Sequence, residues 1–365
     1  MLLALVLLAT TFQNPLKDAG TFPIAVWLQD PGQATRYKSA GINLYVGLWQ
    51  GPTEEQLAAL KKAGMPVVCD QNAVGLRHLA DPTIVAWMHG DEPDNAQAVI
   101  DPATGKQTWG PCVPPARIVA DYRRLKSADP SRPVLLNLGQ GVANDAWKGR
   151  GNGAKLDDYK TYVQGSDIVS FDVYPVAGVG EPLQLGLVAK GVDRLKAWAD
   201  DKKRIWTCLE CTDIGAKGKA TPAQVKAEAW SAIIHGARGL IYFVHQFQPK
   251  FNEHALLDDP EMLAAVTSLN KQIQRYALRL GNVRRAGVMF DNGIHSWAST
   301  VGGNATLFAV SLEDHPVTAV LQLPAELRQS VVEEIEEGRM LSLYDGRAAE
   351  TFAPYQVHIY RIGAR

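Results

Sequence analysis

Short hydrophobic runs alternate with longer stretches of helical periodicity through most of the chain. Each run is rich in β-branched and aromatic residues and contains few polar positions. This pattern is typical of parallel strands buried on both faces, because helices cover both sides of such a sheet. Eight runs predict strands, at 22–28, 42–47, 66–70, 84–89, 133–138, 167–174, 204–210 and 239–245.

The stretches between the runs predict helices, and two of them carry clear boundary signals. Thr53 and Gln56 have the spacing of a capping box, ahead of a helix that ends at Gly64. Thr221 followed by Pro222 opens another helix, with an N-cap hydroxyl and a proline in the first turn. Two further helices are expected, at 115–127 and 261–280.

This alternation of strands and helices predicts a (β/α)8 TIM barrel over residues 21–282. Eight βα units within this length match the barrel in number and size. A doubly wound sheet is the alternative, but no glycine-rich phosphate-binding turn follows a predicted strand. The barrel is therefore the favoured fold class.

The pattern changes in residues 283–365, where helical periodicity disappears. Short apolar runs are separated there by Gly, Asn, Asp and Pro turns, which is typical of an antiparallel β-sandwich. We therefore expect a small C-terminal sandwich after the barrel. Its strands are predicted at 286–290, 306–310, 317–322, 331–335, 340–344 and 355–360.

The first residues, Met1 to Thr10, form an almost wholly apolar run. This run is too short to span a bilayer but fits the hydrophobic region of a secretory signal, although no Lys or Arg precedes it. An N-terminal segment packed on the fold is the alternative. We expect residues 1–20 to be a signal peptide and leader, and the protein to be secreted or periplasmic. No other segment is apolar for long enough to predict a membrane span.

Composition excludes several classes of protein. The 37 basic and 38 acidic side chains nearly cancel, so a nucleic-acid partner is not expected. A hydrophobic content of 46% excludes a disordered chain. Cys208 and Cys211 have a C-x-x-C spacing, but no second pair is present to complete a zinc site. We interpret them as buried thiols beside Glu210 and predict no metal and no cofactor.

Polar residues follow nearly every predicted barrel strand, where the active sites of such barrels lie. Two carboxylates stand out: Glu92 after the fourth strand and Glu210 at the end of the seventh. These strands lie on opposite sides of an eight-stranded barrel, so the two groups could flank a glycosidic bond. Carboxylates, amides and aromatic rings together suit a sugar-binding cleft. The candidate substrate-binding residues are Asp91, Tyr174, Asp172, Asn137, His245, Trp49, Asp70, Trp109 and Gln246.

The motif from Gly90 to Asp94 and the sequence around Glu210 resemble glycoside hydrolase clan A, the retaining β/α-barrel glycosidases. The fourth-strand motif reads Gly-Asp-Glu-Pro-Asp, with Asp91 in place of the usual Asn. Tyr174 matches the position of the aromatic residue that orients the nucleophile in many members. The tryptophan often found after the eighth strand is replaced by His245.

The resemblance implies a retaining glycosidase that acts on an oligosaccharide or polysaccharide by double displacement. Glu210 would be the nucleophile and Glu92 the acid/base, with their carboxyl groups about 5 to 5.5 Å apart. Two other functions stay open. One is a non-catalytic carbohydrate-binding barrel, and the other is a metal-dependent barrel enzyme acting on sugars. Neither G-x-G-x-x-G nor G-x-x-x-x-G-K-[ST] occurs, which disfavours a nucleotide cofactor.

Overall fold

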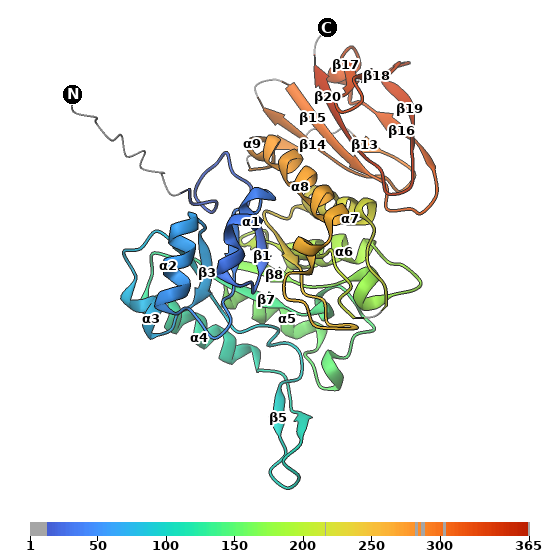
Figure 1. The fold of residues 1–365 in the computed structure, drawn as a ribbon. Helices are drawn as coiled ribbons and strands as arrows, with labels where there is room; N and C mark the ends of the chain where they lie inside the picture. Colours follow the sequence, from blue (N-terminus) through green and yellow to red (C-terminus); the bar gives the residue numbers. More distant parts are fainter. Residues whose placement is uncertain (1–12, 216, 282–283, 286–288, 302–303, 364–365) are drawn as a thin grey trace, which may run out of the picture.

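A computed structural model describes residues 13–215, 217–281, 284–285, 289–301 and 304–363 (Figure 1). A parallel sheet forms the barrel, and its strands follow the eight predicted runs. The strands are β1 (Ile24–Trp27), β2 (Leu44–Val46), β3 (Val67–Asp70), β4 (Ile84–Met88), β7 (Val134–Leu138), β8 (Ile168–Phe171), β9 (Arg204–Ile205), β10 (Thr207–Glu210) and β11 (Leu240–Phe243).

Strands β9 and β10 are two parts of the seventh barrel strand, interrupted at Trp206. The first part pairs with β8 and the second with β11, so together they close the sheet on itself. The Trp206 N–H donates to Val169 O at 2.9 Å, which continues the ladder across the break. The barrel predicted from the sequence is confirmed, and the carboxyl ends of its strands meet at one mouth.

Helices surround the sheet, and the predicted caps are present. The Thr53 hydroxyl accepts from the Gln56 N–H at 3.2 Å, and the Thr53 N–H donates to Gln56 Oε1 at 3.0 Å. Thr221 caps its helix in the same way. The helices are α1 (Ala34–Ser39), α2 (Glu54–Ala63), α3 (Ala73–Arg77), α4 (Pro115–Ala128), α5 (Tyr159–Tyr162), α6 (Gly186–Trp198), α7 (Pro222–His235), α8 (Pro260–Arg275) and α9 (Ala277–Gly281).

One predicted helix differs from the structure. The expected helix at 261–280 is two helices, α8 and α9, because the first one ends at Arg275 and Tyr276 caps it. Tyr276 packs edge-on against Phe308 of the C-terminal region, at 5.4 Å between ring centroids. A contact with a distant part of the chain accompanies this break, and sequence periodicity does not reveal such a contact.

The C-terminal region is a two-layered antiparallel β-structure, as predicted (Figure 1). Its larger sheet has the order β12-β14-β15-β20-β17-β18, and its smaller sheet has the order β13-β16-β19. The strands are β12 (Arg284–Arg285), β13 (Met289–Phe290), β14 (His295–Val301), β15 (Asn304–Val310), β16 (Val317–Gln322), β17 (Val331–Glu334), β18 (Arg339–Met340), β19 (Arg347–Phe352) and β20 (Val357–Gly363).

Several details of this region were not predicted. Strands β12, β14 and β19 were missed; in β19 the buried positions are Ala348, Glu350 and Phe352, and the charged residue among them weakens the apolar signal. The predicted strand at 340–344 is wrong beyond Met340, where β18 ends. Part of the predicted strand at 286–290 lies outside the described residues, and β13 covers only its end.

The barrel and the sandwich share an aromatic contact. Phe308 of β15 stacks on Trp230 of α7 at 5.1 Å and on Trp297 of β14 at 5.7 Å. All three side chains belong to the large hydrophobic core that also includes the barrel helices. Burial of such large rings contributes strongly to stability, so this contact fixes the sandwich against α7 and α8.

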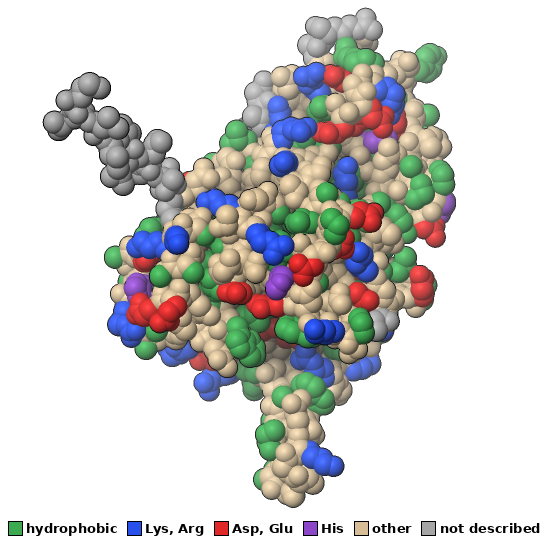
Figure 2. All heavy atoms as spheres, viewed as in Figure 1, with side chains coloured by type: hydrophobic (Ala, Val, Ile, Leu, Met, Phe, Trp, Pro, Cys, Tyr) green, Lys and Arg blue, Asp and Glu red, His purple; other side chains and the backbone are tan. Residues whose placement is uncertain are grey.

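Residues between Asp94 and Pro114 form a β-hairpin, not an irregular loop. Strands β5 (Ala98–Ile100) and β6 (Gln107–Trp109) pair antiparallel and project from the body of the molecule (Figure 1). Both strands are exposed, and the hairpin surface carries hydrophobic side chains (Figure 2).

The apolar run from Met1 to Thr10 lies outside the described residues. Further along the predicted leader, Leu16 is buried with the barrel core, and its carbonyl accepts from Arg204 at 2.9 Å. Within the described ranges, every helix is too short or too polar to cross a bilayer.

Candidate functional site

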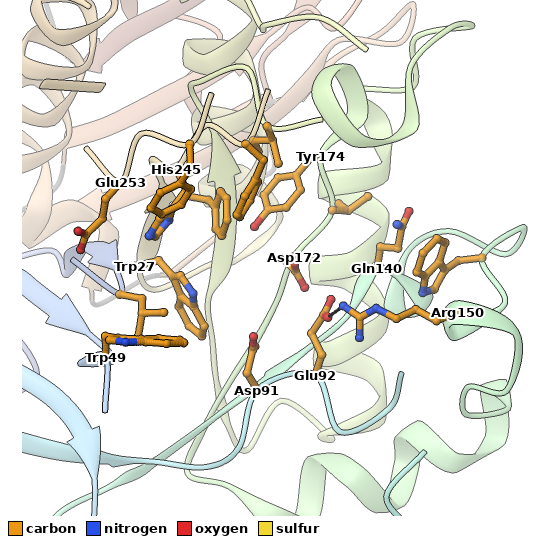
Figure 3. A pocket seen from close by; sticks show the side chains of 17 residues that line it. Trp27, Trp49, Asp91, Glu92, Gln140, Arg150, Asp172, Tyr174, His245 and Glu253 are labelled. Atoms are coloured by element: carbon orange, nitrogen blue, oxygen red, sulfur yellow. Dashed lines mark hydrogen bonds and ion pairs between the residues drawn. The ribbon is translucent and has the colours of Figure 1, made fainter. Parts of the chain in front are cut away.

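A pocket of about 770 Å³ opens at the carboxyl ends of the barrel strands (Figure 3). Three carboxyl groups and one guanidinium lie on one side of it, and on the other lie the rings of Trp27, Trp49 and His245 together with Glu253. Six of the predicted site residues line this pocket: Asp91, Glu92, Asp172, Tyr174, His245 and Trp49.

Glu92 follows β4 and is held in the pocket by backbone and side-chain contacts. Its N–H donates to Asn137 O at 3.1 Å, which ties the segment to the end of β7. Its backbone has a φ of 41°, a left-handed conformation that is uncommon for a residue with a side chain. Arg150 Nη2 donates to Glu92 Oε2 at 2.5 Å. This contact is an ion pair, and it places a positive charge directly beside the Glu92 carboxyl group.

Asp172 follows β8, and its carboxyl group lies beside that of Glu92 (Figure 3). The charges of the two groups act on one another at this short range. Asp172 Oδ1 is buried, and no hydrogen-bond partner reaches it from the described residues. Burial, together with the neighbouring charge of Glu92, raises the pKa of Asp172 well above its usual range. Of the cluster's carboxyl groups, Asp172 is thus one whose surroundings favour the protonated form.

Asp91 is the third carboxyl group of the cluster. Asn137 Nδ2 donates to Asp91 Oδ1 at 3.0 Å, and Ser170 Oγ donates to Asn137 Oδ1 at 2.7 Å. Burial raises the pKa of Asp91 to about 7, and the charge of Glu92 adds to this effect. Asn137 was predicted to bind substrate, but it is buried below Asp91 and supports that side chain instead.

Glu210 lies at the end of β10, as predicted, but does not line the pocket. Its side chain is fully buried, with 0% exposure. Its two oxygens accept from the N–H groups of Val176 and Ala177 at 2.7 and 2.5 Å. Its other neighbour is Glu228 of α7, whose two carboxyl oxygens are buried and have no hydrogen-bond partner among the described residues. The expectation that Glu210 faces Glu92 across the pocket is therefore corrected.

The cause of this correction is local. Residues Pro175–Val179 form a single π-helical turn directly after Asp172 and Tyr174. The first N–H groups of a helical turn have no partner within the turn, and the Glu210 carboxylate accepts two of them. The sequence pattern predicts that Glu210 lies at a strand end. It does not predict which backbone N–H groups will lie within reach of its carboxylate.

Aromatic side chains form the wall opposite Arg150. His245 is buried; burial lowers its pKa to about 4, so its ring is neutral at physiological pH. Trp49 is 68% exposed although it lines the pocket, so one ring face is open to a ligand. The aromatic residues of the lining are Trp27, Trp49, Trp147, Tyr174, Phe243, Phe247 and Phe251.

Besides Asn137, three predicted substrate-binding residues lie outside the lining. Asp70 ends β3 without reaching the pocket. Gln246 exchanges backbone hydrogen bonds with Asn252. Trp109 lies on the projecting hairpin, and Arg150 Cζ lies 5.2 Å from the centroid of its ring.

Several lining residues were not among the predicted site residues, including Arg150, Trp27, Phe251 and Glu253. Trp27 lies within a predicted strand, two residues before Gln29, and its side chain points into the mouth (Figure 3). Arg150 lies between two glycines in a loop after β7, and neither its spacing nor a motif pointed to it. Its role depends on where the loop folds, which the sequence pattern does not show.

A metal site was one of the alternatives. Across the described ranges, no group of three or more His, Cys, Asp and Glu side chains has an arrangement that could hold a metal ion. The four cysteines are free thiols, with Cys208 and Cys211 buried as expected.

The chain is similar in fold to several solved glycoside hydrolase structures. One, designated an alpha-galactosidase/melibiase from Bacteroides fragilis, has a TM-score of 0.59 and 10% identity, over 94% of this chain and 79% of that one. A family 39 glycoside hydrolase from Bacteroides cellulosilyticus has a TM-score of 0.55 and 12% identity, over 94% and 82%. AmyP in complex with maltose has a TM-score of 0.56 and 8% identity, over 96% and 98%.

At these identities the similarity concerns the fold. It confirms the architecture expected from the resemblance to barrel glycosidases, a barrel followed by a C-terminal β-domain. No protein-family model matches the chain, and no curated protein matches its sequence. A shared fold does not determine function, which depends on the residues of the pocket itself.

Proposed function

We propose that this protein is a glycoside hydrolase whose active site is the pocket at the barrel mouth. The observation that carries the proposal is the convergence of Asp91, Glu92 and Asp172 opposite an aromatic wall. Aromatic faces can stack on the C–H faces of a sugar, while carboxyl groups bind its hydroxyls and perform acid–base chemistry. The glycoside hydrolases of similar fold support this reading.

The pocket provides one charged and one protonated carboxyl group, as glycosidic bond cleavage requires. Glu92 is paired with Arg150 and is the carboxylate. Asp172 carries the proton and is the acid. This assignment differs from the one that the resemblance implied, in which Glu210 is the nucleophile and Glu92 the acid/base. For that assignment, Glu210 would have to leave the Val176 and Ala177 N–H groups and enter the pocket.

We infer double displacement from this arrangement. Glu92 forms a bond to the anomeric carbon while the bond to the leaving oxygen breaks, and the proton of Asp172 passes to that oxygen. Asp172, now a carboxylate, then takes a proton from water, whose oxygen displaces Glu92 from the sugar. In this mechanism the sugar enters between the carboxyl groups of Asp172 and Glu92.

The test is hydrolysis of a panel of aryl glycosides by the wild-type protein and by single variants. We expect Glu92→Ala to lose activity and to regain it with azide, giving a glycosyl azide of inverted configuration. We expect Asp172→Asn to lose about 100- to 10,000-fold on poor leaving groups and much less on good ones. Asp70→Asn, at a strand end outside the pocket, is the matched control and should remain active.

Other outcomes would change the proposal in defined ways. Azide rescue of Glu210→Ala but not of Glu92→Ala would return the nucleophile role to Glu210. Sugar binding without turnover across the panel would indicate a carbohydrate-binding protein. Loss of wild-type turnover with a chelator, restored by a divalent cation, would indicate a metal-dependent enzyme.

A further inference from the structure

Arg150 reaches the carboxyl cluster from an unusual backbone position. It lies in the turn Gly149–Gly151 after β7, and its φ is 58°, in the left-handed region that side chains rarely adopt. Gly149 and Gly151 also have positive φ values, of 54° and 100°. The two glycines adopt such values without strain, but at Arg150 the conformation costs free energy, so the surrounding contacts must hold this residue in place.

Two contacts hold the guanidinium group itself. On one side Nη2 donates to Glu92 Oε2 at 2.5 Å, as the dashed line in Figure 3 shows. On the other side Cζ lies 5.2 Å from the centroid of the Trp109 ring, within the range of a cation–π interaction. The Arg150 side chain is 37% exposed. The Trp109 ring covers part of the guanidinium surface that would otherwise be in contact with solvent.

The charges around Glu92 come from several elements. Asp91 and Asp94 lie on its own segment, and Asp172 and Tyr174 follow β8. The Cys208 thiol of β10 also lies near these carboxyls. In the described part of the chain, Arg150 supplies the one cationic side chain that forms an ion pair with the cluster.

We propose that Arg150 is a positioning residue that keeps the negative charge of the carboxyl cluster on Glu92, and that Trp109 of the hairpin acts through Arg150. The proposal rests on the glycoside hydrolase function proposed above. It gives the hairpin a role in catalysis without contact with the sugar. It also explains why Trp109, predicted to bind substrate, lies outside the pocket lining.

The proposal predicts how the charge moves when Arg150 is removed. Without the guanidinium, the carboxylate form of Glu92 is less stabilised. The proton then distributes more evenly between Glu92 and Asp172. The enzyme then needs a higher pH to reach its active state, in which Glu92 is charged and Asp172 is protonated. The positive charge of Arg150 also opposes the raised pKa of Asp91, so that pKa should rise further on its removal.

The experiment measures the pH dependence of kcat/KM on a neutral aryl glycoside. We expect the acid limb of Arg150→Met to move up by about one pH unit, with kcat falling more than KM changes. Arg150→Lys keeps the charge and should restore most of the wild-type profile. Trp109→Ala should shift the limb in the same direction by less, and Trp109→Phe should stay near wild type.

Ile100→Ala is the matched control for the hairpin, because Ile100 is exposed on the neighbouring strand and does not line the pocket. It should leave the profile unchanged. Thermal unfolding of every variant checks that the fold is retained. A second readout needs no turnover: carboxyl ¹³C NMR should show the titration midpoint of Asp91 rising in Arg150→Met.

Two results would overturn the proposal. If Arg150→Met keeps the wild-type pH profile but loses affinity for uronic acid glycosides, Arg150 binds a substrate carboxylate instead. If Trp109→Ala raises KM for long oligosaccharides without moving the limb, Trp109 is a sugar platform. Failure of the wild-type protein to cleave any glycoside would instead refute the proposed function, and the NMR shift would still decide the role of Arg150.

Discussion

The Val176 N–H donates a 2.7 Å hydrogen bond to Glu210 Oε1, and this contact holds the carboxylate at the end of the seventh barrel strand away from the pocket. Ala177 occupies the second carboxylate oxygen in the same way. Glu210 thereby ties β10 to the turn that follows Asp172 and Tyr174. Its carboxylate positions the segment that carries a pocket residue, and it lies outside the pocket itself.

The first prediction concerns the stability that Glu210 provides. In Glu210→Ala the Val176 and Ala177 N–H groups lose their acceptor in a buried environment, at a cost of about 1 to 3 kcal/mol each. We expect the free energy of unfolding, measured by urea denaturation, to fall by about 2 to 5 kcal/mol. Asp157→Ala, at an exposed position, should change it by less than about 0.5 kcal/mol. An unchanged stability would mean that these N–H groups find another partner.

The second prediction concerns Glu228, which is fully buried next to Glu210. Burial raises the pKa of Glu228 well above its usual range, and the charge of Glu210 adds to this. The folded protein therefore holds a proton that the unfolded chain releases above about pH 4.3, so this group lowers stability as pH rises. The difference in melting temperature between Glu228→Gln and wild type should therefore increase, in favour of Glu228→Gln, as the pH rises from 5 to 8. A constant difference in melting temperature across this range would contradict the raised pKa.

The third prediction concerns the alkaline limb of activity. Asp172 has to be protonated to act as the acid, and burial raises its pKa. Activity should therefore be present at mildly acidic pH and fall as Asp172 loses its proton with rising pH. Asp91, with a pKa of about 7, adds a negative charge nearby as it ionises. With a substrate whose leaving group needs no protonation, Asp172→Asn should lack this limb. If the limb persists in that variant, another group is the acid.

The fourth prediction concerns packing between α6 and β8. A Cβ atom on Gly191 would lie 2.2 Å from Cε2 of Phe171, which is buried in the core. Gly191→Ala should therefore destabilise the protein by about 1 to 3 kcal/mol, because the ring has to move. Gly186→Ala in the same helix meets no atom within 4 Å and should be neutral or stabilising. Equal effects of the two substitutions would show that backbone entropy, not packing, determines them.

The sequence by itself determined the architecture of this protein. Strands buried on both faces need continuous apolar runs, so the eight barrel strands were visible one by one. The capping box at Thr53 and the proline after Thr221 marked helix starts through local hydrogen bonds that involve neighbouring residues only. The rule that strand ends form the barrel mouth then placed Asp91, Glu92, Asp172 and His245 in one pocket.

Only the tertiary structure decided which of these carboxyl groups face one another. A position at a strand end fixes where a side chain starts, but its direction depends on partners that are distant in sequence. Glu210 turns toward the N–H groups of a turn more than thirty residues earlier, and Arg150 meets Glu92 across 58 positions. Such pairings depend on how loops fold over the barrel, and hydrophobic periodicity contains no information about them.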